Sequence, residues 1–415
     1  MSGPDLIDRL RISRKSDLVR DLCDVLSSLC GGRRKDREQI WAVGVVTDIL
    51  DGQIEERRDL GRIALIRFSV PEAAWTLPLC DWPEDLRKVV LARYYIVPGG
   101  YEIDGRETLP FNDSLFKQYA SDAVNQSDAI VLSSPFSLLY PSHELRGRDL
   151  MREIDGSKDV ICSHEVSGIG LALRETASAL NATLMSPATK MVKSFREVLC
   201  QVGINPSKLF FATAHGLLAP GDYASVFPGL LLGSRAVAFL QGVHFISRED
   251  DFIAVDCRHD GAKAYFMFEG TPERRLSFRF GGVLTNHFGP RVSGRFVDLE
   301  SVSEWLHRAC NLKNRSVFLV GTPPAKVNKD WKVLDIEVVE AIGAAIASEG
   351  VFIERFFTPG HSLRSARHQV EALAAGYEAG LCQSRESSLR TDVYDFPVPF
   401  LPEGSIGIRA IIHRN

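Results

Sequence analysis

The residues from Asp251 to Gly270 read DFIAVDCRHDGAKAYFMFEG and carry the clearest indication of the fold. An apolar run, Phe252 to Val255, ends at Asp256, crosses a polar turn and returns as the alternating run Ala264 to Phe268. Two short runs of β-forming residues around a polar turn that contains glycine are typical of a hairpin. The sequence therefore predicts a strand, a tight turn and a second strand, with a carboxylate where the first strand ends.

This hairpin resembles the phosphate hairpin of sugar-kinase, Hsp70 and actin-type ATPases, whose turn reads roughly D-x-G-G-T-x-T-D. There the glycines let backbone N–H groups approach a phosphate, and the acids organise a magnesium ion. Asp256 matches the first acid, but Arg258 and His259 replace the two glycines and Lys263 replaces the terminal acid. A lysine cannot ligate magnesium. The turn therefore predicts the fold of these ATPases without their nucleotide chemistry.

The neighbouring sequence is similar to the hydantoinase A/oxoprolinase family. SHEVSGIGLALRETASALNATL, Ser163 to Leu184, aligns without a gap with the family pattern S-H-E-I-x-x-L-G-L-x-E-R-E-N-A-T-x-L-N-A-x-L. The resemblance covers nearly the whole chain and is strongest between about Asp128 and Asn286. The other matching segments, in the family's order, are Gly99 to Glu107, Pro135 to Arg146, Leu209 to Tyr223, Phe227 to Gly242, Glu340 to Ala347 and Val398 to Ala410.

The resemblance implies an α/β fold of the actin-like, sugar-kinase or Hsp70 type (RNase H-like), with two lobes. The alternation of predicted strands and helices is also typical of the α/β class. We expect residues 1–127 to form a truncated N-terminal hydantoinase-like region, 128–300 a hydantoinase A-like core, and 301–415 a C-terminal region that completes the second lobe. Family members open unactivated cyclic amides with the help of ATP.

Four departures from the family pattern lie at separate nucleotide-contacting places. The chain starts with MSGPDLIDRLRIS, which resembles the segment after the family's first phosphate hairpin, and VGVVTDIL (Val43 to Leu50) replaces a hydroxyl-rich segment. A long glycine-rich insertion is missing before RSVFLVG, and GTPPAK (Gly321 to Lys326) replaces a G-G-G-S loop, so that prolines remove N–H donors. We therefore expect the first phosphate hairpin and one insertion to be missing, and neither ATP hydrolysis nor a bound cofactor.

The composition excludes several classes of function. The chain has 415 residues, 45% hydrophobic and 25% charged, with a net charge of -4, which gives no general attraction to nucleic acid or to an anionic membrane. Neither a membrane span nor a signal peptide is evident, so a cytoplasmic location is expected. The eight cysteines form no C-x-x-C pair, and no His/Cys cluster predicts a metal site.

Histidine is the usual acid/base group near neutral pH. His164 and Glu165 follow the predicted strand Val160 to Cys162, a place where α/β folds present functional side chains. His215 also follows a predicted strand, and His259 lies in the altered turn. The predicted catalytic residues are therefore His164, Glu165, His215 and His259. Each histidine is alternatively a structural residue whose ring is satisfied by the backbone.

Other polar residues are predicted to bind the substrate. Asn181 matches the family's N-A-x-L segment and either lines a pocket or bridges neighbouring backbone. Arg258 and Lys263, beside Asp256, either form a solvated turn or hold a carboxylate or phosphate without a metal, because fixed cations neutralise an anion directly. Thr213 lies in a segment whose counterpart in the family is rich in amide side chains. The predicted substrate-binding residues are Asn181, Thr213, Asp256, Arg258, Lys263 and His287.

The sequence leaves two hypotheses for the function. In the first, the protein is an ATP-independent hydrolase-like or acid/base enzyme acting on a small cyclic amide, imide or related ring. In the second, it is a non-catalytic pseudoenzyme subunit that binds and stabilises a hydantoinase-type or pathway partner. The alternatives for a protein partner are a second copy of the chain or a hydantoinase-type subunit. Histidines converging on an open pocket favour the first hypothesis, and a filled cleft favours the second.

Overall fold

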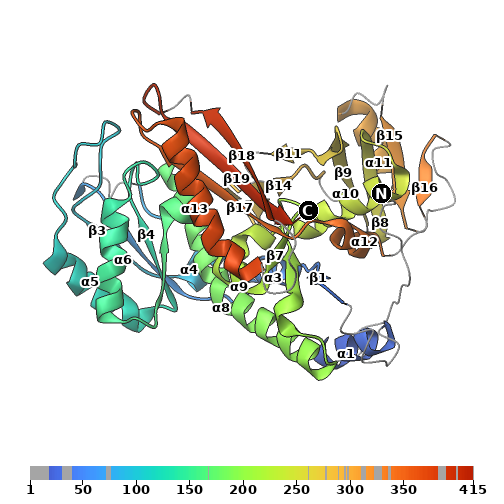
Figure 1. Cartoon of the computed structure of the whole chain (residues 1–415), viewed down its shortest axis with the longest axis horizontal. Helices are drawn as coiled ribbons and strands as arrows, with labels where there is room; N and C mark the ends of the chain where they lie inside the picture. The colour runs from blue at the N-terminus through green and yellow to red at the C-terminus, as the bar shows by residue number, and fades with distance from the viewer. Residues whose placement is uncertain are drawn as a thin grey trace.

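The computed structural model of the chain describes residues 18–29, 40–71, 76–166, 168–259, 261–275, 278–287, 289–293, 296, 299–309, 315–321, 330–334, 338–381, 389–398 and 401–414. Within these residues, three groups of strands lie side by side with helices between them (Figure 1). The predicted mixed α/β class is confirmed, with parallel pairing in each of the three groups.

A four-stranded sheet in the order β3-β2-β4-β5 forms one end of the molecule, and all of its strand pairs are parallel. Every residue of β2 and β4 is buried, which agrees with the rule that parallel sheets are covered on both faces. The sheet takes strands from both sides of residue 128. Its elements are β2 (Ile63–Phe68), α4 (Glu84–Val90), β3 (Leu91–Val97), α5 (Asp113–Gln126), β4 (Ala129–Ser133), α6 (Ser142–Ile154) and β5 (Asp159–Cys162).

The predicted hairpin is present as β8 (Phe252–His259) and β9 (Gly261–Phe268), which pair antiparallel. It lies in a five-stranded sheet of order β10-β9-β8-β15-β16, in which β8, β15 and β16 run parallel. The other elements here are β10 (Thr271–Pro272), α11 (Leu299–Ala309), β15 (Ser316–Val320) and β16 (Lys332–Leu334). The predicted loop after Gly321 lies outside the described residues.

The third group consists of two small sheets that a single bridge between Leu218 and Glu349 joins. One sheet has the order β1-β6-β7, with β1 and β6 parallel, and the other has the antiparallel order β17-β19-β18. The strands are β1 (Val43–Val45), β6 (Leu209–Ala212), β7 (Leu218–Pro220), β17 (Gly350–Phe357), β18 (Leu389–Pro397) and β19 (Ile406–Arg414). Helix α13 (Leu363–Leu381) covers one face of the second sheet (Figure 1).

Long and closely packed helices connect these groups. Helix α8 (Leu171–Gln201) contacts β2, β4 and β5, and it also packs against α1 and α9. Helices α10 and α12 cross at Gly242 and Gly343, where the backbones come so close that a Cβ atom on either glycine would overlap a carbonyl oxygen of the other helix. The remaining elements are α1 (Leu18–Leu29), α3 (Ile49–Glu56), α7 (Ser163–Val166), η2 (Pro206–Lys208), α9 (Gly221–Val226), η3 (Pro228–Leu231), α10 (Ser234–Ser247), β11 (Arg274–Arg275), β12 (Phe278–Phe280), β13 (Val283–Thr285), β14 (Gly289–Pro290) and α12 (Val339–Ile346).

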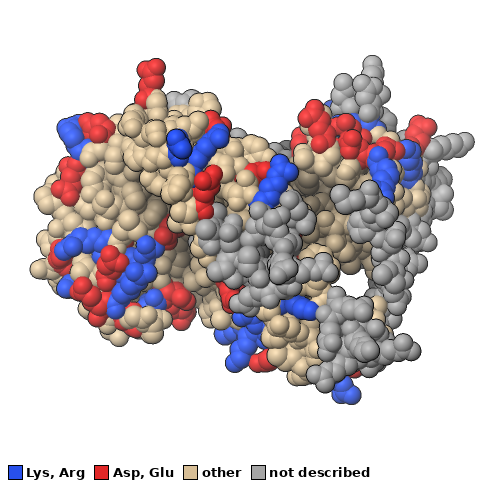
Figure 2. Space-filling model, viewed as in Figure 1, with Lys and Arg blue, Asp and Glu red and all other residues tan. Residues whose placement is uncertain are grey.

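The surface agrees with the balanced composition. On the face drawn in Figure 2, acidic and basic side chains are interspersed, notably over α5 and α6. Among the described residues, no helix combines the length and apolar character that crossing a membrane requires.

Candidate functional site

Strand β8 continues past Asp256 to His259, so Arg258 lies in the strand and not in the predicted turn, at a place where the pairing with β9 is irregular. The main-chain N–H of Arg258 and its Nε both donate to Asp256 Oδ1, at 3.1 and 2.8 Å, and Nη2 donates to Asp256 Oδ2 at 2.8 Å. The same guanidinium donates to both carboxylate oxygens of Glu340, at 2.8 and 2.6 Å. Its Cγ lies 2.7 Å from where a Cβ atom on Gly321 would be, so Arg258 occupies the space between the ends of β8 and β15.

Ionic contacts extend this cluster to the segment before α3. Arg235, on α10, contacts Glu340 at 3.2 Å and Asp48, before α3, at 2.8 Å. Burial alone raises the pKa of the Glu340 carboxyl, but the hydrogen bonds and charge of Arg258 outweigh burial and lower it. Asp256, Arg258 and Glu340 are therefore joined through Arg235 to Asp48 in one ionic cluster. Lys263, opposite Asp256 in the hairpin, is exposed.

A second polar cluster lies where the strands of the parallel sheet end. Glu144, on α6, is fully buried and accepts hydrogen bonds from Ser163 Oγ at 2.6 Å, from His164 Nδ1 at 2.7 Å and from the main-chain N–H of His164 at 3.2 Å. Burial raises the pKa of the Glu144 carboxyl, but the bonds from His164 and Ser163 and the charge of the buried Arg174 outweigh it and lower that pKa. Glu144 is thus an ionised acceptor, and Nδ1 of the His164 ring is the donor that faces it.

The same cluster has the ligand types of a metal site, but its charges oppose one. Glu144, Cys162 and His164 each present a ligand atom within 4.8 Å of the others. However, Glu144 already accepts three hydrogen bonds, and the cations Arg174 and Arg148 act on Glu144 and Cys162 respectively. Burial, together with the charges of Glu144 and Glu165, raises the pKa of the Cys162 thiol, so a thiolate ligand is not favoured. The arrangement fits a hydrogen-bonded Glu–His pair.

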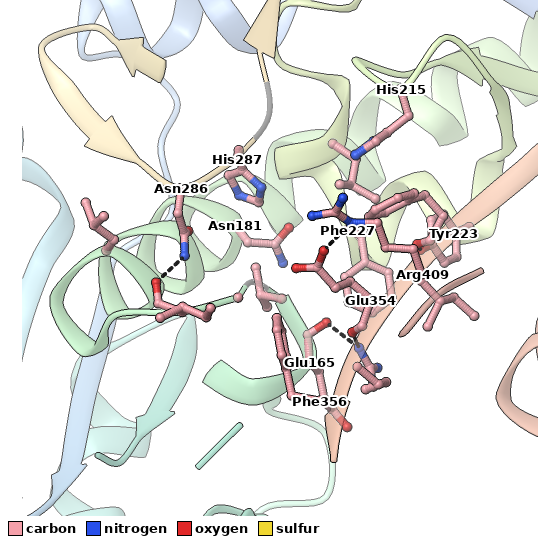
Figure 3. A pocket seen from close by; sticks show the side chains of 18 of the residues that line it. Glu165, Asn181, His215, Tyr223, Phe227, Asn286, His287, Glu354, Phe356 and Arg409 are labelled. Carbon is pink, nitrogen blue, oxygen red and sulfur yellow. Dashed lines mark hydrogen bonds and ion pairs between the residues drawn. The ribbon is translucent and has the colours of Figure 1, made fainter. Parts of the chain in front are cut away.

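An open cavity of ≈ 450 Å³ lies next to this pair (Figure 3). Its walls come from the end of α7, from α8, from the turns after β6 and β13, and from β17, β18 and β19. His164 Nε2 lies 4.0 Å from Oε1 of Glu165, which lines the cavity. The apolar part of the wall is aromatic: His215 stacks on Phe352 with 4.0 Å between ring centroids. The cavity therefore has the size and mixed character of a small-molecule site.

The charged side chains of the wall are mostly paired. Arg148 donates to Glu165 at 2.6 Å, and Arg409 donates to Glu354 at 2.6 Å; Figure 3 shows the latter pair at the cavity wall. Arg355 donates from Nη1 to the main-chain oxygens of Glu354 and Glu165, at 2.8 and 3.4 Å.

Two predicted substrate-binding residues meet at the back of the cavity (Figure 3). Asn181 donates to the carbonyl of Val226 at 2.9 Å and accepts from the N–H of Gly229 at 3.1 Å, so its amide bridges backbone, as one of the two interpretations predicted, while it also lines the cavity. His287 is buried, and burial lowers its pKa to about 4, so its ring is neutral at physiological pH. Asn181 and His287 shape the wall.

The structure gathers only some of the predicted site residues. Glu165, Asn181, His215 and His287 line the cavity, and His164 is next to it. Thr213 instead closes the turn between β6 and β7 by hydrogen bonds with Leu217. Asp256, Arg258 and Lys263 belong to the hairpin, and the side chain of His259 lies outside the described part of the chain.

Residues that the sequence did not single out complete the site. Glu144 lies in the family-like segment PSHELR, which was a usable signal, because it puts a second His-Glu pair near the first. Glu354 and Arg355 interrupt the apolar run VFIERFF, which is unusual in a strand with buried neighbours. The sequence around Arg409 gave no comparable indication that this residue belongs to the site.

Comparison with solved structures reveals two known enzymes of the same fold. Acetone carboxylase, in a nucleotide-free structure from work on ATP-dependent acetone carboxylation, superposes with a TM-score of 0.66 at 10% identity, covering 96% of this chain and 82% of that one. An ATP-dependent caprolactamase from Pseudomonas jessenii gives 0.61 at 12% identity, covering 95% and 82%. The chain shares the fold of these two enzymes. Both belong to the hydantoinase/oxoprolinase family, whose motifs the sequence resembles.

Sequence comparison adds little to this. An uncharacterised protein of Methanocaldococcus jannaschii is 24% identical over 222 residues, which are 50% of this chain and 32% of that protein. The matched part thus spans about a third of the relative's length. No family model matches the chain.

Proposed function

We propose that this protein is a hydantoinase/oxoprolinase-like enzyme that works without ATP, using acid/base chemistry on a small cyclic amide, imide or related ring in the cavity. The hydrogen bond of 2.7 Å between Glu144 Oε2 and His164 Nδ1 carries the proposal. Because an ionised carboxylate only accepts, the ring donates from Nδ1 and keeps a lone pair on Nε2. A histidine oriented in this way is a usual proton acceptor in catalysis.

The proposed reaction is the hydrolysis of the C–N bond of the ring. His164 Nε2 takes a proton from a water molecule, and the resulting hydroxide adds to the carbonyl carbon of the ring. The C–N bond then breaks, and the nitrogen takes the proton back from the imidazolium. Glu144 positions the ring and stabilises its charged form. Without ATP to activate the carbonyl, the fitting substrates are rings whose C–N bond is easier to break, such as imides.

The absence of ATP chemistry is supported by the hairpin. Arg258 packs its Cγ against Gly321 at the end of β15 and its guanidinium against Asp256 and Glu340, where the resemblance to actin-like ATPases would place backbone N–H groups facing a phosphate. Asp256 accepts three hydrogen bonds from Arg258, so it is committed to an internal cation. Glu340 accepts two more hydrogen bonds from the same guanidinium, and Arg235 supplies a second cation beside Glu340. A nucleotide phosphate would have to displace this cluster.

The finer description of the fold belongs to the same proposal. An actin-like, two-lobed architecture that lacks the first phosphate hairpin and one insertion is supported by the place of β8 and β9 in a mixed five-stranded sheet and by the closely packed pair α10 and α12. The division into regions 1–127, 128–300 and 301–415, and a cytoplasmic location, remain predictions.

The pseudoenzyme hypothesis fits the structure less well. A subunit that only stabilises a partner has no need of an open cavity with an oriented histidine beside it. The cavity of ≈ 450 Å³ and the Glu144–His164 pair support catalysis instead.

The proposal is tested with a panel of rings: succinimide, glutarimide, hydantoin and dihydrouracil. Ring opening is followed by loss of ultraviolet absorbance, with and without Mg-ATP. We expect at least one ring to be opened at a rate that ATP leaves unchanged. His164→Gln should lower kcat by roughly 100-fold or more, and Glu144→Gln should lower kcat with little effect on KM. His361→Gln, at an exposed histidine, is the matched control. Ring opening that requires ATP, or none at all, would refute the proposal.

A further inference from the structure

We infer that the ring compound held in this cavity carries a negatively charged group, of the carboxylate kind, and that Arg355 binds it. The inference rests on the proposed function in one respect only, namely that the cavity holds a small ring compound. It concerns which ligands enter, whatever reaction occurs there.

One cation in the lining of the cavity has no carboxylate partner among the described residues. Its lining contains two carboxylates, Glu165 and Glu354, and two guanidinium groups, Arg355 and Arg409. Glu165 is paired with Arg148, which lies behind the wall, and Glu354 is paired with Arg409. Among the described residues, no carboxylate oxygen lies within 4.0 Å of a nitrogen of Arg355. Arg355 is therefore the cation of the lining that is available to an anionic ligand.

The hydrogen bonds of Arg355 leave donors for a ligand. A guanidinium has five N–H donors. One nitrogen of Arg355, Nη1, is held by the main-chain oxygens of Glu354 and Glu165. These two acceptors are neutral, so they orient the guanidinium without neutralising it. Its planar fork matches the two oxygens of a carboxylate, which is why arginine is the usual partner of that group in recognition sites.

The rest of the wall explains why a charge here needs a partner. Arg355 is only partly exposed, and its neighbours in the lining include the aromatic rings of Phe352, Phe356 and Phe396. A cation that is partly removed from water loses hydration free energy, and the attraction of an opposite charge compensates for that loss. The same rings offer apolar surface for the ring of the ligand. An anionic group on a compact ring therefore satisfies both parts of the wall.

The experiment compares two probes that differ in charge but hardly in shape, cyclohexanecarboxylate and cyclohexanecarboxamide, on the full chain at pH 7.5. Binding is measured by isothermal titration calorimetry and by the rise in Tm. We expect the carboxylate to bind about tenfold or more tightly than the carboxamide. Arg355→Gln should abolish that preference, and Arg355→Lys, which keeps the charge but not the fork, should retain part of it. Arg152→Gln, at an exposed arginine on α6, should leave it unchanged.

The outcomes separate this inference from the proposed function. If the carboxamide binds as well as the carboxylate to the wild-type protein, the inference is wrong and the cavity still binds rings. If the carboxylate binds equally well to a folded Arg355→Gln variant, the anion lies elsewhere and the inference is wrong. If neither probe binds, both the inference and the small-molecule cavity are refuted. The wild-type comparison does not depend on any variant folding.

Discussion

Arg258 and Glu340 form a two-pronged ion pair, with Nη1 to Oε2 at 2.8 Å and Nη2 to Oε1 at 2.6 Å, that ties the hairpin of β8 and β9 to helix α12. Both side chains are nearly buried, at 13% and 14% exposure. The pair therefore acts as a fixed internal contact between the hairpin and α12, and its removal has a predictable cost.

Replacing Arg258 by glutamine should lower the free energy of unfolding by about 3–5 kcal/mol, because the nearly buried Asp256 would lose the guanidinium beside it and Glu340 would be left with its 3.2 Å contact to Arg235. Urea denaturation followed by circular dichroism measures the change. The control is Arg308→Gln, which removes an exposed pair with Glu304 on α11 and should cost less than about 1 kcal/mol. Equal stability of Arg258→Gln and the wild type would show that the ion pair contributes nothing.

The crossing of α10 and α12 should tolerate no side chain at its two glycines. A Cβ atom at Gly343 would overlap the carbonyl of Ala238, and one at Gly242 would overlap the carbonyl of Val339. Neither backbone can move without separating the helices, so Gly343→Ala should lower Tm strongly or prevent folding. Gly52→Ala, in α3, is the matched control, because nothing lies within 4 Å of its Cβ position, and it should stabilise by roughly 0.5–1 kcal/mol.

Local patterns in the sequence were enough to predict many of the elements. The apolar runs at 63–68 and 129–133 are the strands β2 and β4, and the long apolar stripe after Gly170 is α8. Patterns failed where turn residues interrupt the chain. Strand β3 follows a stretch punctuated by prolines and was not predicted.

The site was predictable only where its residues are close in sequence. Ser163-His164-Glu165 follows a buried strand, and that local context placed it at a site. The wall formed by Glu354, Arg355 and Arg409 depends on the pairing of β17 with β19 and on their approach to α7 and α8. Such contacts between distant segments leave no periodic pattern, so the single sequence did not reveal them. The burial of Arg258 against Glu340 was hidden for the same reason.

Asp51 should make the protein less stable as the pH rises. Burial, with a smaller contribution from the charge of Asp48, raises the pKa of its carboxyl to about 7, although a hydrogen bond from the N–H of Gly233 partly opposes this. A raised carboxyl pKa stabilises the fold fully below the unfolded value of 3.8, and this stabilisation is lost as the pH rises to about 7. Asp51→Asn keeps an acceptor for Gly233 and removes the charge.

We therefore expect Asp51→Asn to be more stable than the wild type at pH 8 and to lose this advantage towards pH 4. Urea denaturation at pH 4.5, 6 and 8 measures the difference. Asp149→Asn, at an exposed carboxylate on α6, should show no such trend. A constant difference between Asp51→Asn and wild type across this range would contradict the raised pKa.

His287 should act on stability in the opposite direction over nearly the same pH range. Burial lowers the pKa of its ring to about 4, a change that a hydrogen bond with the backbone of Ala177 only partly offsets. The depressed pKa means that the fold is fully stable above the unfolded value of 6.5 and loses stability as the pH falls towards 4, because the unfolded ring takes up the proton first. The loss is on the order of 3 kcal/mol. His287→Gln cannot titrate, so its unfolding free energy should fall less than that of the wild type between pH 7 and pH 4.5.

Asp51 stabilises the fold on acidification, so it opposes the effect of His287. If the two effects are similar, the unfolding free energy of the wild type changes little with pH. Only the difference between variant and wild type then isolates each group. Parallel curves for His287→Gln and wild type would mean that the ring is protonated equally easily in the folded and unfolded chains.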